Sequence, residues 1–270
     1  MLYGSLFYVL VPLCLAASIT LYGVLDRAKV ELGFEHYTEK ADPNSMLKMP
    51  ANALVNFGYL ILGIYWILVT KKTQQKLKEE AFFYYVFSWL AVFYSAVQFG
   101  RIVTQTRVFA ILDQWLTLPF FAWVVCWNEY VYRDYLWQSS RFMFIMRLSI
   151  LSYAAALFHD QGFEFSLGLH ILAAVAYSVR TQTRIGNKTS LKYFVYACVS
   201  CSGFVFLKLA DHYLGQFDIF QRFSGHFWSK IADIGQIYCV LKYFQSLRCL
   251  EKEKKKLNIG NVNKLVKKRK

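Results

Sequence analysis

The feature that most constrains the fold of this chain is a series of long apolar runs along nearly its whole length. A bilayer core about 30 Å thick is crossed by roughly 20 mostly apolar residues in a helix. In lipid, a spanning chain satisfies its backbone hydrogen bonds only as helices or as a closed barrel. Because the runs have helical length, they predict an all-α, multi-pass transmembrane bundle.

Eight runs can be counted, which predicts a seven-helix core with one additional helix at the N-terminus. The first four hold a single charged residue, Asp113, whereas the later runs hold several polar residues. The predicted spans are residues 5–25, 50–70, 82–100, 108–128, 142–158, 163–179, 191–210 and 223–244. Only residues 159–162 separate the fifth run from the sixth, so this pair is predicted to form a tight helical hairpin.

Composition supports a membrane protein over a soluble domain. Of the 270 residues, 56% are hydrophobic and only 18% are charged, where soluble domains are nearer a quarter charged. The first run could instead be a signal peptide. It has no basic residue before it and is longer than a typical signal core, so we interpret it as a retained helix.

The basic residues predict the orientation of the bundle. With eight spans, both termini and alternate loops lie on one side, and the more basic side is cytoplasmic. That side holds Lys71, Lys72, Lys76, Lys78, Arg133, Arg141, Arg180, Arg184, Lys188, Lys192 and the tail. The other side holds Arg27, Lys29, Lys40, Lys48, Arg101, Arg107 and Arg222. We therefore expect both termini in the cytoplasm of an endomembrane (endoplasmic reticulum or Golgi) or plasma membrane protein.

The C-terminal tail accounts for half of the net charge of +14, since residues 251–270 hold nine Lys or Arg and two Glu. We expect residues 1–250 to form a single membrane domain and residues 251–270 a disordered cytoplasmic tail. The tail could contact anionic lipid at about 1 kcal/mol per basic residue, or it could be simply solvated. Residues 267–270 match a dilysine retrieval pattern. No base-reading surface is indicated, so the expected partner is the lipid bilayer and not nucleic acid.

The six cysteines do not indicate a disulfide framework, because none lies in the long loop of residues 26–49. Cys198 and Cys201 have the spacing of a redox or metal motif, but they lie within an apolar run. Small residues three apart in such a run more often permit close helix packing.

Polar residues inside the apolar runs are the most informative. A charge at the bilayer centre costs about 2.5–3.5 kcal/mol, so it normally faces the protein interior and has a partner. His226, Lys230 and Asp233 share one helix face by their spacing of four and three residues. We predict that Lys230 pairs with Asp113, with Asp211 and Asp233 as rival partners.

These residues are predicted to form one buried network, which could fix helix register or could form a ligand-binding or catalytic centre. The predicted network or pocket comprises Asn52, Asn56, Ser95, Asp113, Lys208, Asp211, His226, Lys230 and Asp233. No catalytic residue, metal ligand or cofactor is predicted.

Three segments resemble the transmembrane protein 187 family. They are residues 49–56 (MPANALVN), residues 112–119 (LDQWLTLP) and residues 225–230 (GHFWSK). This resemblance covers most of the chain and implies a multi-pass membrane protein without specifying a reaction.

The chain is also distantly similar to the superfamily of alkaline ceramidases and progestin/adiponectin receptors, which have seven helices and a zinc site made by three histidines. The matching residues are Asn52, Asn56, Ser95, Asp113 and His226, and Asp211 resembles an aspartate of the penultimate helix. This resemblance implies that the second to eighth runs form the seven-helix core.

Two departures from that superfamily concern the metal. Phe99 and Lys230 stand where the superfamily has zinc-binding histidines, and Val55 replaces a serine. Hydrolytic zinc needs three protein ligands and an open water position, which His226 alone does not provide. Lys230 could instead replace the positive charge of the metal.

The sequence therefore favours a non-catalytic relative of the zinc hydrolases, with a lipid-binding or receptor-like role. Two alternatives stay open: a transporter or channel that uses the buried charges, and a membrane lipid hydrolase with an altered site.

Overall fold

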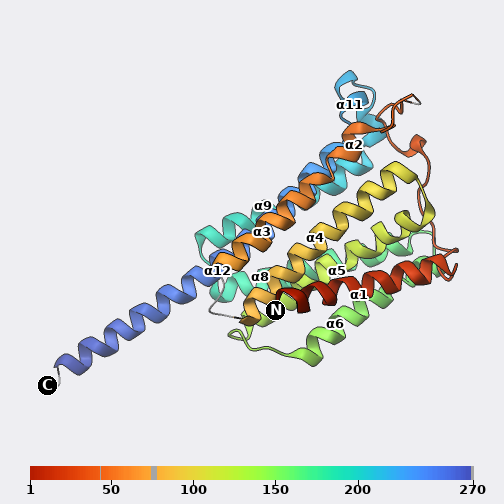
Figure 1. The fold of residues 1–270 in the computed structure, drawn as a ribbon. Coiled ribbons are helices and arrows are strands. Elements are labelled where there is room, and N and C mark those ends of the chain that lie inside the picture. The colour runs from red at the N-terminus through yellow and green to blue at the C-terminus, as the bar shows by residue number, and fades with distance from the viewer. Residues whose placement is uncertain (43, 74–77, 269–270) are drawn as a thin grey trace.

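A computed structural model of the chain describes residues 1–42, 44–73 and 78–268 (Figure 1). Within these residues the regular structure is helical, as predicted, and no strand is present. The helices are α1 (Leu2–Leu21), η1 (Phe34–His36), α2 (Pro50–Leu54), α3 (Phe57–Thr73), α4 (Lys78–Thr104), α5 (Arg107–Tyr132), α6 (Ser139–Ser152), α7 (Ala155–Phe158), α8 (Gly162–Ile185), α9 (Lys188–Leu209), α10 (Asp211–Leu214), α11 (Asp218–Arg222) and α12 (Gly225–Lys268).

Seven stretches of the described chain are long and apolar enough to cross a membrane, and they coincide with the first seven predicted spans. They are Leu2–Leu21, Pro50–Thr73, Glu79–Thr104, Arg107–Tyr132, Ser139–Phe158, Gly162–Ile185 and Lys188–Leu209. The multi-pass helical fold is thus confirmed.

The predicted eighth span lies on α12, whose Lys230, Asp233 and Lys242 make it less apolar than the other seven. Figure 1 nevertheless shows α12 running along the bundle beside α3, and its main packing partner is α9. A membrane crossing by α12 stays a prediction, which this path through the bundle favours.

The two ends of the bundle differ in the segments that lie there: the long loop and two short helices at one end, and the chain terminus Met1 at the other. We call the end with residues 22–49, α10 and α11 the loop end, and the end with Met1 the terminal end (Figure 1). α12 extends past the terminal end, so both ends of the chain leave the bundle on the same side.

Several helices are longer than the apolar runs that predicted them. α4 was predicted over residues 82–100 but ends at Thr104, which places Arg101 inside the helix. The difference arises because polar residues continue a helix beyond the lipid-facing run when they have partners at the bundle end. α12 likewise continues as a helix to Lys268, where we expected disorder from residue 251, since Lys, Glu and Leu favour helix. The domain boundary at residue 250 stays a prediction.

The predicted hairpin between the fifth and sixth spans is confirmed: α7 ends at Phe158 and α8 begins at Gly162. α6 and α7 together form the fifth span, with a break at residues 153–154. Gly162 suits this hairpin because a Cβ there would lie 2.1 Å from the backbone oxygen of Ala155.

The core lies around α4 and α5, the two most buried spans. Aromatic rings fill it, and Trp127 of α5 stacks on Phe244 of α12 with centroids 4.0 Å apart. α1 packs against α4 and α5, which makes it part of the bundle. α3 and α4 approach closely at Gly63, where a Cβ would lie 2.7 Å from the backbone oxygen of Ser88.

α8 and α9 are adjacent in sequence but pack mainly on other helices. α8 lies chiefly against α5, and α9 chiefly against α12. α8 and α9 thus contact each other little, and both line the polar interior described next.

Candidate functional site

The centre of the polar site is the carboxylate of Asp113, which lies near the start of α5 at the loop end. Asp113 accepts hydrogen bonds from the guanidinium of Arg101 and from the side-chain amide of Gln98, both on α4. The ion pair is buried, with the two side chains 9% and 8% exposed. A buried carboxylate needs this kind of compensation for its lost hydration.

Lys230 reaches Asp113 only through Gln98. Its ammonium donates to the side-chain oxygen of Gln98, whose amide nitrogen donates to Asp113. Among the described residues, no carboxylate lies within 4.0 Å of the Lys230 nitrogen. Our prediction of a direct Lys230–Asp113 pair was wrong, because Arg101 from the neighbouring helix occupies that position.

The two rival partners of Lys230 are engaged elsewhere. Asp233 accepts a hydrogen bond of 2.7 Å from the hydroxyl of Tyr59 on α3. Asp211 accepts 2.8 Å from the Nδ1 of His226 and 3.0 Å from the backbone amide of Thr38. Asp211 thus ties the long loop to the beginning of α12.

The environment of Asp211 favours its ionised form. Burial alone would raise the pKa of this carboxyl, but hydrogen bonds and charge interaction with His226, together with the Thr38 amide, lower it below its ordinary value. Gly225 permits the close approach, since a Cβ there would lie 2.9 Å from the Asp211 Cα.

A second cluster lies at the beginning of α2 and contains a carboxylate from the loop. Glu39 is buried and accepts hydrogen bonds of 2.8 Å from the backbone amides of Ala51 and Asn52. Its side chain therefore caps the N-terminus of α2, although Glu39 itself lies in the preceding loop. The Asn52 side chain also donates 2.9 Å to Ser224, whose hydroxyl caps α12 by accepting from Phe227. This cluster joins the first and last helices of the predicted core.

Asn56 and Ser95 join α4 to the chain just before α3. The Asn56 side chain donates 2.8 Å to the Asn52 backbone oxygen, and Ser95 donates 2.7 Å to the Asn56 backbone oxygen. Both side chains are buried, and their bonds to backbone fix local helix geometry.

A cavity of about 330 Å³ opens beside Asp113 and Lys230. Its walls come from the long loop and from α4, α5, α8, α9 and α12. They include Glu31, Tyr37, Tyr94, Gln98, Arg101, Asp113, Gln114, Thr117, Phe163, Glu164, Leu167, Gly168, Ile171, Phe204, Val205, Lys208, Leu209, His226, Ser229 and Lys230. One part of the wall is charged, and the part made by α8 and α9 is mostly apolar.

The predicted residues therefore divide into two groups. Asp113, Lys208, His226 and Lys230 line the cavity. Asn52, Asn56, Ser95, Asp211 and Asp233 do not line it but hydrogen-bond the helices around it.

Sequence reasoning missed several cavity residues. Arg101 was assigned to a loop because it follows the apolar run, although it lies three residues after Gln98 on the same helix face. That spacing was a usable signal for placing Arg101 beside Gln98. Tyr37 of the cavity and Glu39 of the cluster at α2 come from a loop without periodicity, so no sequence signal placed them here. Burial raises the pKa of Tyr37.

The residues present do not fit a zinc site. Among the described residues, no three His, Cys, Asp or Glu side chains lie close enough together to hold a metal ion. Phe99 instead packs against Phe57, and Lys230 donates a hydrogen bond to Gln98.

Comparison with known proteins identifies close relatives. The model of the TMEM187 protein family matches residues 5–245. Transmembrane protein 187 of Bos taurus is 41% identical over 248 residues, which cover 90% of this chain and 96% of the relative. Transmembrane protein 187 of Homo sapiens is 42% identical over 231 residues, which cover 84% and 85% of the two chains. No solved structure matches the chain.

The family match spans every predicted membrane segment, from the first helix to the part of α12 beside α9. It also contains all the residues of the polar site. This chain belongs to the TMEM187 protein family.

Proposed function

We propose that this protein binds an amphiphile with an anionic head group in the cavity beside Lys230, without catalysis. The observation that carries the proposal is the state of Lys230, whose ammonium is buried and has the neutral Gln98 as its hydrogen-bond partner. An ammonium has three donors, and a buried charge is costly unless it is paired. A bound anion would supply the missing charge.

The other charges on the wall do not supply it. Asp113 is neutralised by Arg101, while Glu31 is 55% exposed and lies 3.9 Å from Arg101. Glu164 is also exposed. Lys208 adds a further positive charge to the wall. The interior of the cavity is thus more positive than negative.

The apolar part of the cavity suits the hydrocarbon tail of the same molecule. Phe163, Leu167 and Ile171 of α8 face Phe204 and Val205 of α9 across the cavity. Ile171 also lines a smaller apolar cleft, of about 50 Å³, farther along the same two helices. We propose that an acyl chain enters between α8 and α9, which contact each other little.

A distant relationship to the seven-helix zinc hydrolases is part of the proposal. It is supported by the way in which Asn52, Ser95, Asp113 and His226 gather at one end of the bundle. In this protein Lys230 would provide the positive charge that a metal provides in those enzymes. A lysine attracts an anion but does not activate water as zinc does, which favours binding over hydrolysis.

The binding test uses oleate and the matched neutral probe oleyl alcohol with the purified full-length protein in detergent. We expect oleate to raise the melting temperature of the parent and of Lys230→Arg, and oleyl alcohol to raise it much less. Lys230→Gln should lose the preference for oleate. The control is Lys242→Gln on the same helix, because Lys242 does not line the cavity.

Equal effects of the two probes on the parent, or an unchanged preference in Lys230→Gln, would exclude an anion site at Lys230. Release of fatty acid from an amide- or ester-linked lipid would overturn the non-catalytic part of the proposal. Lys230-dependent flux of oleate across proteoliposomes would indicate a transporter instead.

We also propose that both termini face the cytoplasm, in an endomembrane or the plasma membrane. The clustering of basic residues at the terminal end supports this orientation. The basic residues after position 250 would then face anionic lipid of the cytoplasmic leaflet.

A further inference from the structure

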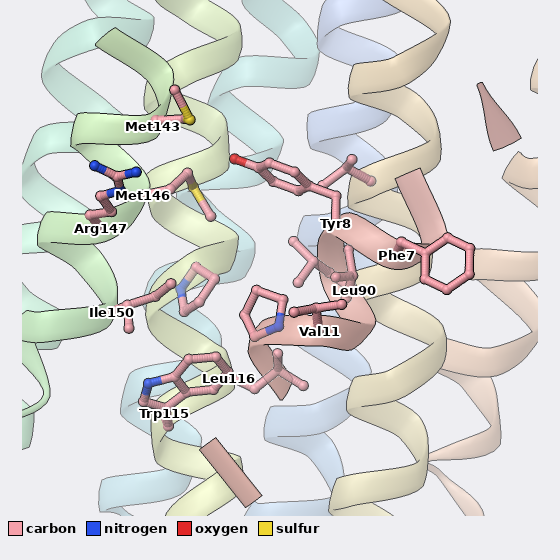
Figure 2. Close-up of a pocket in the computed structure, with 14 residues that line it drawn as sticks. Phe7, Tyr8, Val11, Leu90, Trp115, Leu116, Met143, Met146, Arg147 and Ile150 are labelled. Atoms are coloured by element: carbon pink, nitrogen blue, oxygen red, sulfur yellow. The ribbon is translucent and has the colours of Figure 1, made fainter. Parts of the chain in front are cut away.

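A second cavity lies between α1, α4, α5 and α6, away from the polar site. It has a volume of about 280 Å³, and most of its walls are apolar. Figure 2 shows α1 residues, among them Tyr8 and Val11, on one side and α6 residues, among them Met146 and Arg147, on the other. This cavity plays no part in the proposed function.

Arg147 is the unusual residue of this cavity. It lies eight residues after Ser139, the first residue of α6, and therefore about 12 Å along the helix from the terminal end. Its side chain is exposed, yet it belongs to the membrane-spanning stretch Ser139–Phe158. Among the described residues it has no ion-pair or hydrogen-bond partner.

The other arginines of this part of the bundle each lie beside a carboxylate. Arg133, Arg141 and Arg180 all lie within 3.1 Å of the Glu129 carboxylate. Arg184 pairs with Asp134 at 3.1 Å. Arg147 thus stands apart as a charge at membrane depth without a counterion among the described residues, a costly arrangement that usually marks a binding site or pathway.

A second polar group faces the same part of the cavity. Figure 2 shows the hydroxyl of Tyr8 pointing across the cavity toward Met143 and Met146, with the Arg147 guanidinium on the far side of these methionines. The structure gives the Tyr8 hydroxyl no hydrogen-bond partner among the described residues, although its ring contacts Phe82 and Trp123.

The cavity continues as an apolar groove toward the loop end. A neighbouring cavity of about 320 Å³ shares four wall residues with it: Val11, Pro12, Trp115 and Ile150. It extends to Leu25 and Leu157 between α1 and α7. The two together form a path with a cationic group near one end and hydrocarbon walls along the rest.

We propose that this path between α1 and α6 binds one anionic glycerophospholipid, with its phosphate on Arg147 and the Tyr8 hydroxyl and an acyl chain along the groove. The charge supports this occupant, since a phosphate supplies the missing counterion and accepts hydrogen bonds from a guanidinium fork. The position supports it as well. A long arginine side chain that points toward the nearer membrane surface meets lipid head groups there.

The experiment measures tryptophan quenching by brominated-chain lipids in vesicles that contain the full-length protein. One set of vesicles contains a fifth of brominated phosphatidylcholine and the other a fifth of brominated phosphatidylserine, each in a background of unbrominated phosphatidylcholine. The contribution of Trp115, which lines both cavities, is obtained by difference from Trp115→Phe. We expect brominated phosphatidylserine to quench Trp115 several-fold more than brominated phosphatidylcholine does at the same mole fraction.

Arg147→Met should remove this preference while leaving quenching by phosphatidylcholine intact, and Arg147→Lys should retain part of it. Arg147→Met replaces an exposed charge in a span by an apolar residue, so it should fold well. Lys192→Met is the matched control, since Lys192 is an exposed basic residue near the terminal end but lies on α9, outside the groove. A parent without head-group preference, or one that Lys192→Met abolishes equally, would overturn the proposal.

Discussion

Lys230 on α12 and Asp113 on α5 are joined by a single side chain, the amide of Gln98, which hydrogen-bonds to both. Arg101 makes the direct ion pair with Asp113. The four residues connect three helices in one chain of contacts, so a change in any one of them alters the electrostatic environment of the others.

The first prediction concerns the Arg101–Asp113 pair. Asp113→Asn and Arg101→Gln should each lower the free energy of unfolding by about 3–5 kcal/mol, because each leaves the other charge buried and unpaired. The double variant should recover part of that loss. Denaturant titration in mild detergent of the four proteins provides the double-mutant cycle.

The control for this cycle is the exposed pair Lys29–Asp160, whose side chains are 66% and 77% exposed at 3.2 Å. Its single variants should cost about 0–1 kcal/mol. Strictly additive losses at Arg101 and Asp113 would contradict a direct ion pair. Coupling between Lys230→Met and Asp113→Asn should be smaller, since Gln98 separates them.

The second prediction concerns acid stability through Asp211. Its pKa in the folded protein is lower than in the unfolded chain, where an aspartate titrates near about 3.9. Its stabilising contribution is therefore complete above that pH and is lost as the pH falls through the folded pKa. The denaturation midpoint of Asp211→Asn should fall less than that of the parent between about pH 5 and about pH 3. Parallel pH profiles would show that Asp211 is not a stabilising carboxylate.

The third prediction concerns Glu129, which joins α5, α6 and α8 at the terminal end. Its side chain is 1% exposed and faces Arg133, Arg141 and Arg180. Glu129→Gln should lower the free energy of unfolding by about 1.5–3 kcal/mol, the range for hydrogen bonds to charged groups. Asp134→Asn is the control, because Asp134 is 81% exposed in its pair with Arg184 and should cost less than about 1 kcal/mol. An equal loss in the two variants would count against a bridging role for Glu129.

The fourth prediction concerns topology. Because α12 runs along the bundle to the end that holds Met1, tags at the two termini should face the same side, which we predict to be the cytoplasm. In sealed microsomes, added protease should remove both tags. Protection of one tag alone would show that α12 does not cross the membrane, and protection of both would reverse the orientation.

The fifth prediction concerns metal content. Since no three His, Cys, Asp or Glu side chains of the described residues lie close enough together to hold a metal ion, the purified protein should contain far less than one zinc per chain. Elemental analysis of protein purified without chelator measures this, and Phe99→His combined with Lys230→His tests whether histidines at these positions create a zinc site. Stoichiometric zinc in the parent would refute the expectation.

The sequence by itself determined the helical membrane fold and most of the order of the spans. Apolar runs of bilayer length are a local property, and in lipid only internally hydrogen-bonded helices fit them. The sequence also singled out Asp113, His226 and Lys230 as interior residues, because a polar side chain in an apolar run needs a partner.

Only the tertiary structure decided which partners these residues have. Gln98 and Arg101 lie on α4, and Glu39 comes from a loop, so their proximity to α5, α2 and α12 depends on how the helices are placed side by side. The depth of Arg147 in the bundle could be read from its place in an apolar run. The lack of a counterion for Arg147 could not be read from the sequence. Periodicity describes one helix at a time, whereas charge neutralisation depends on side chains from several helices.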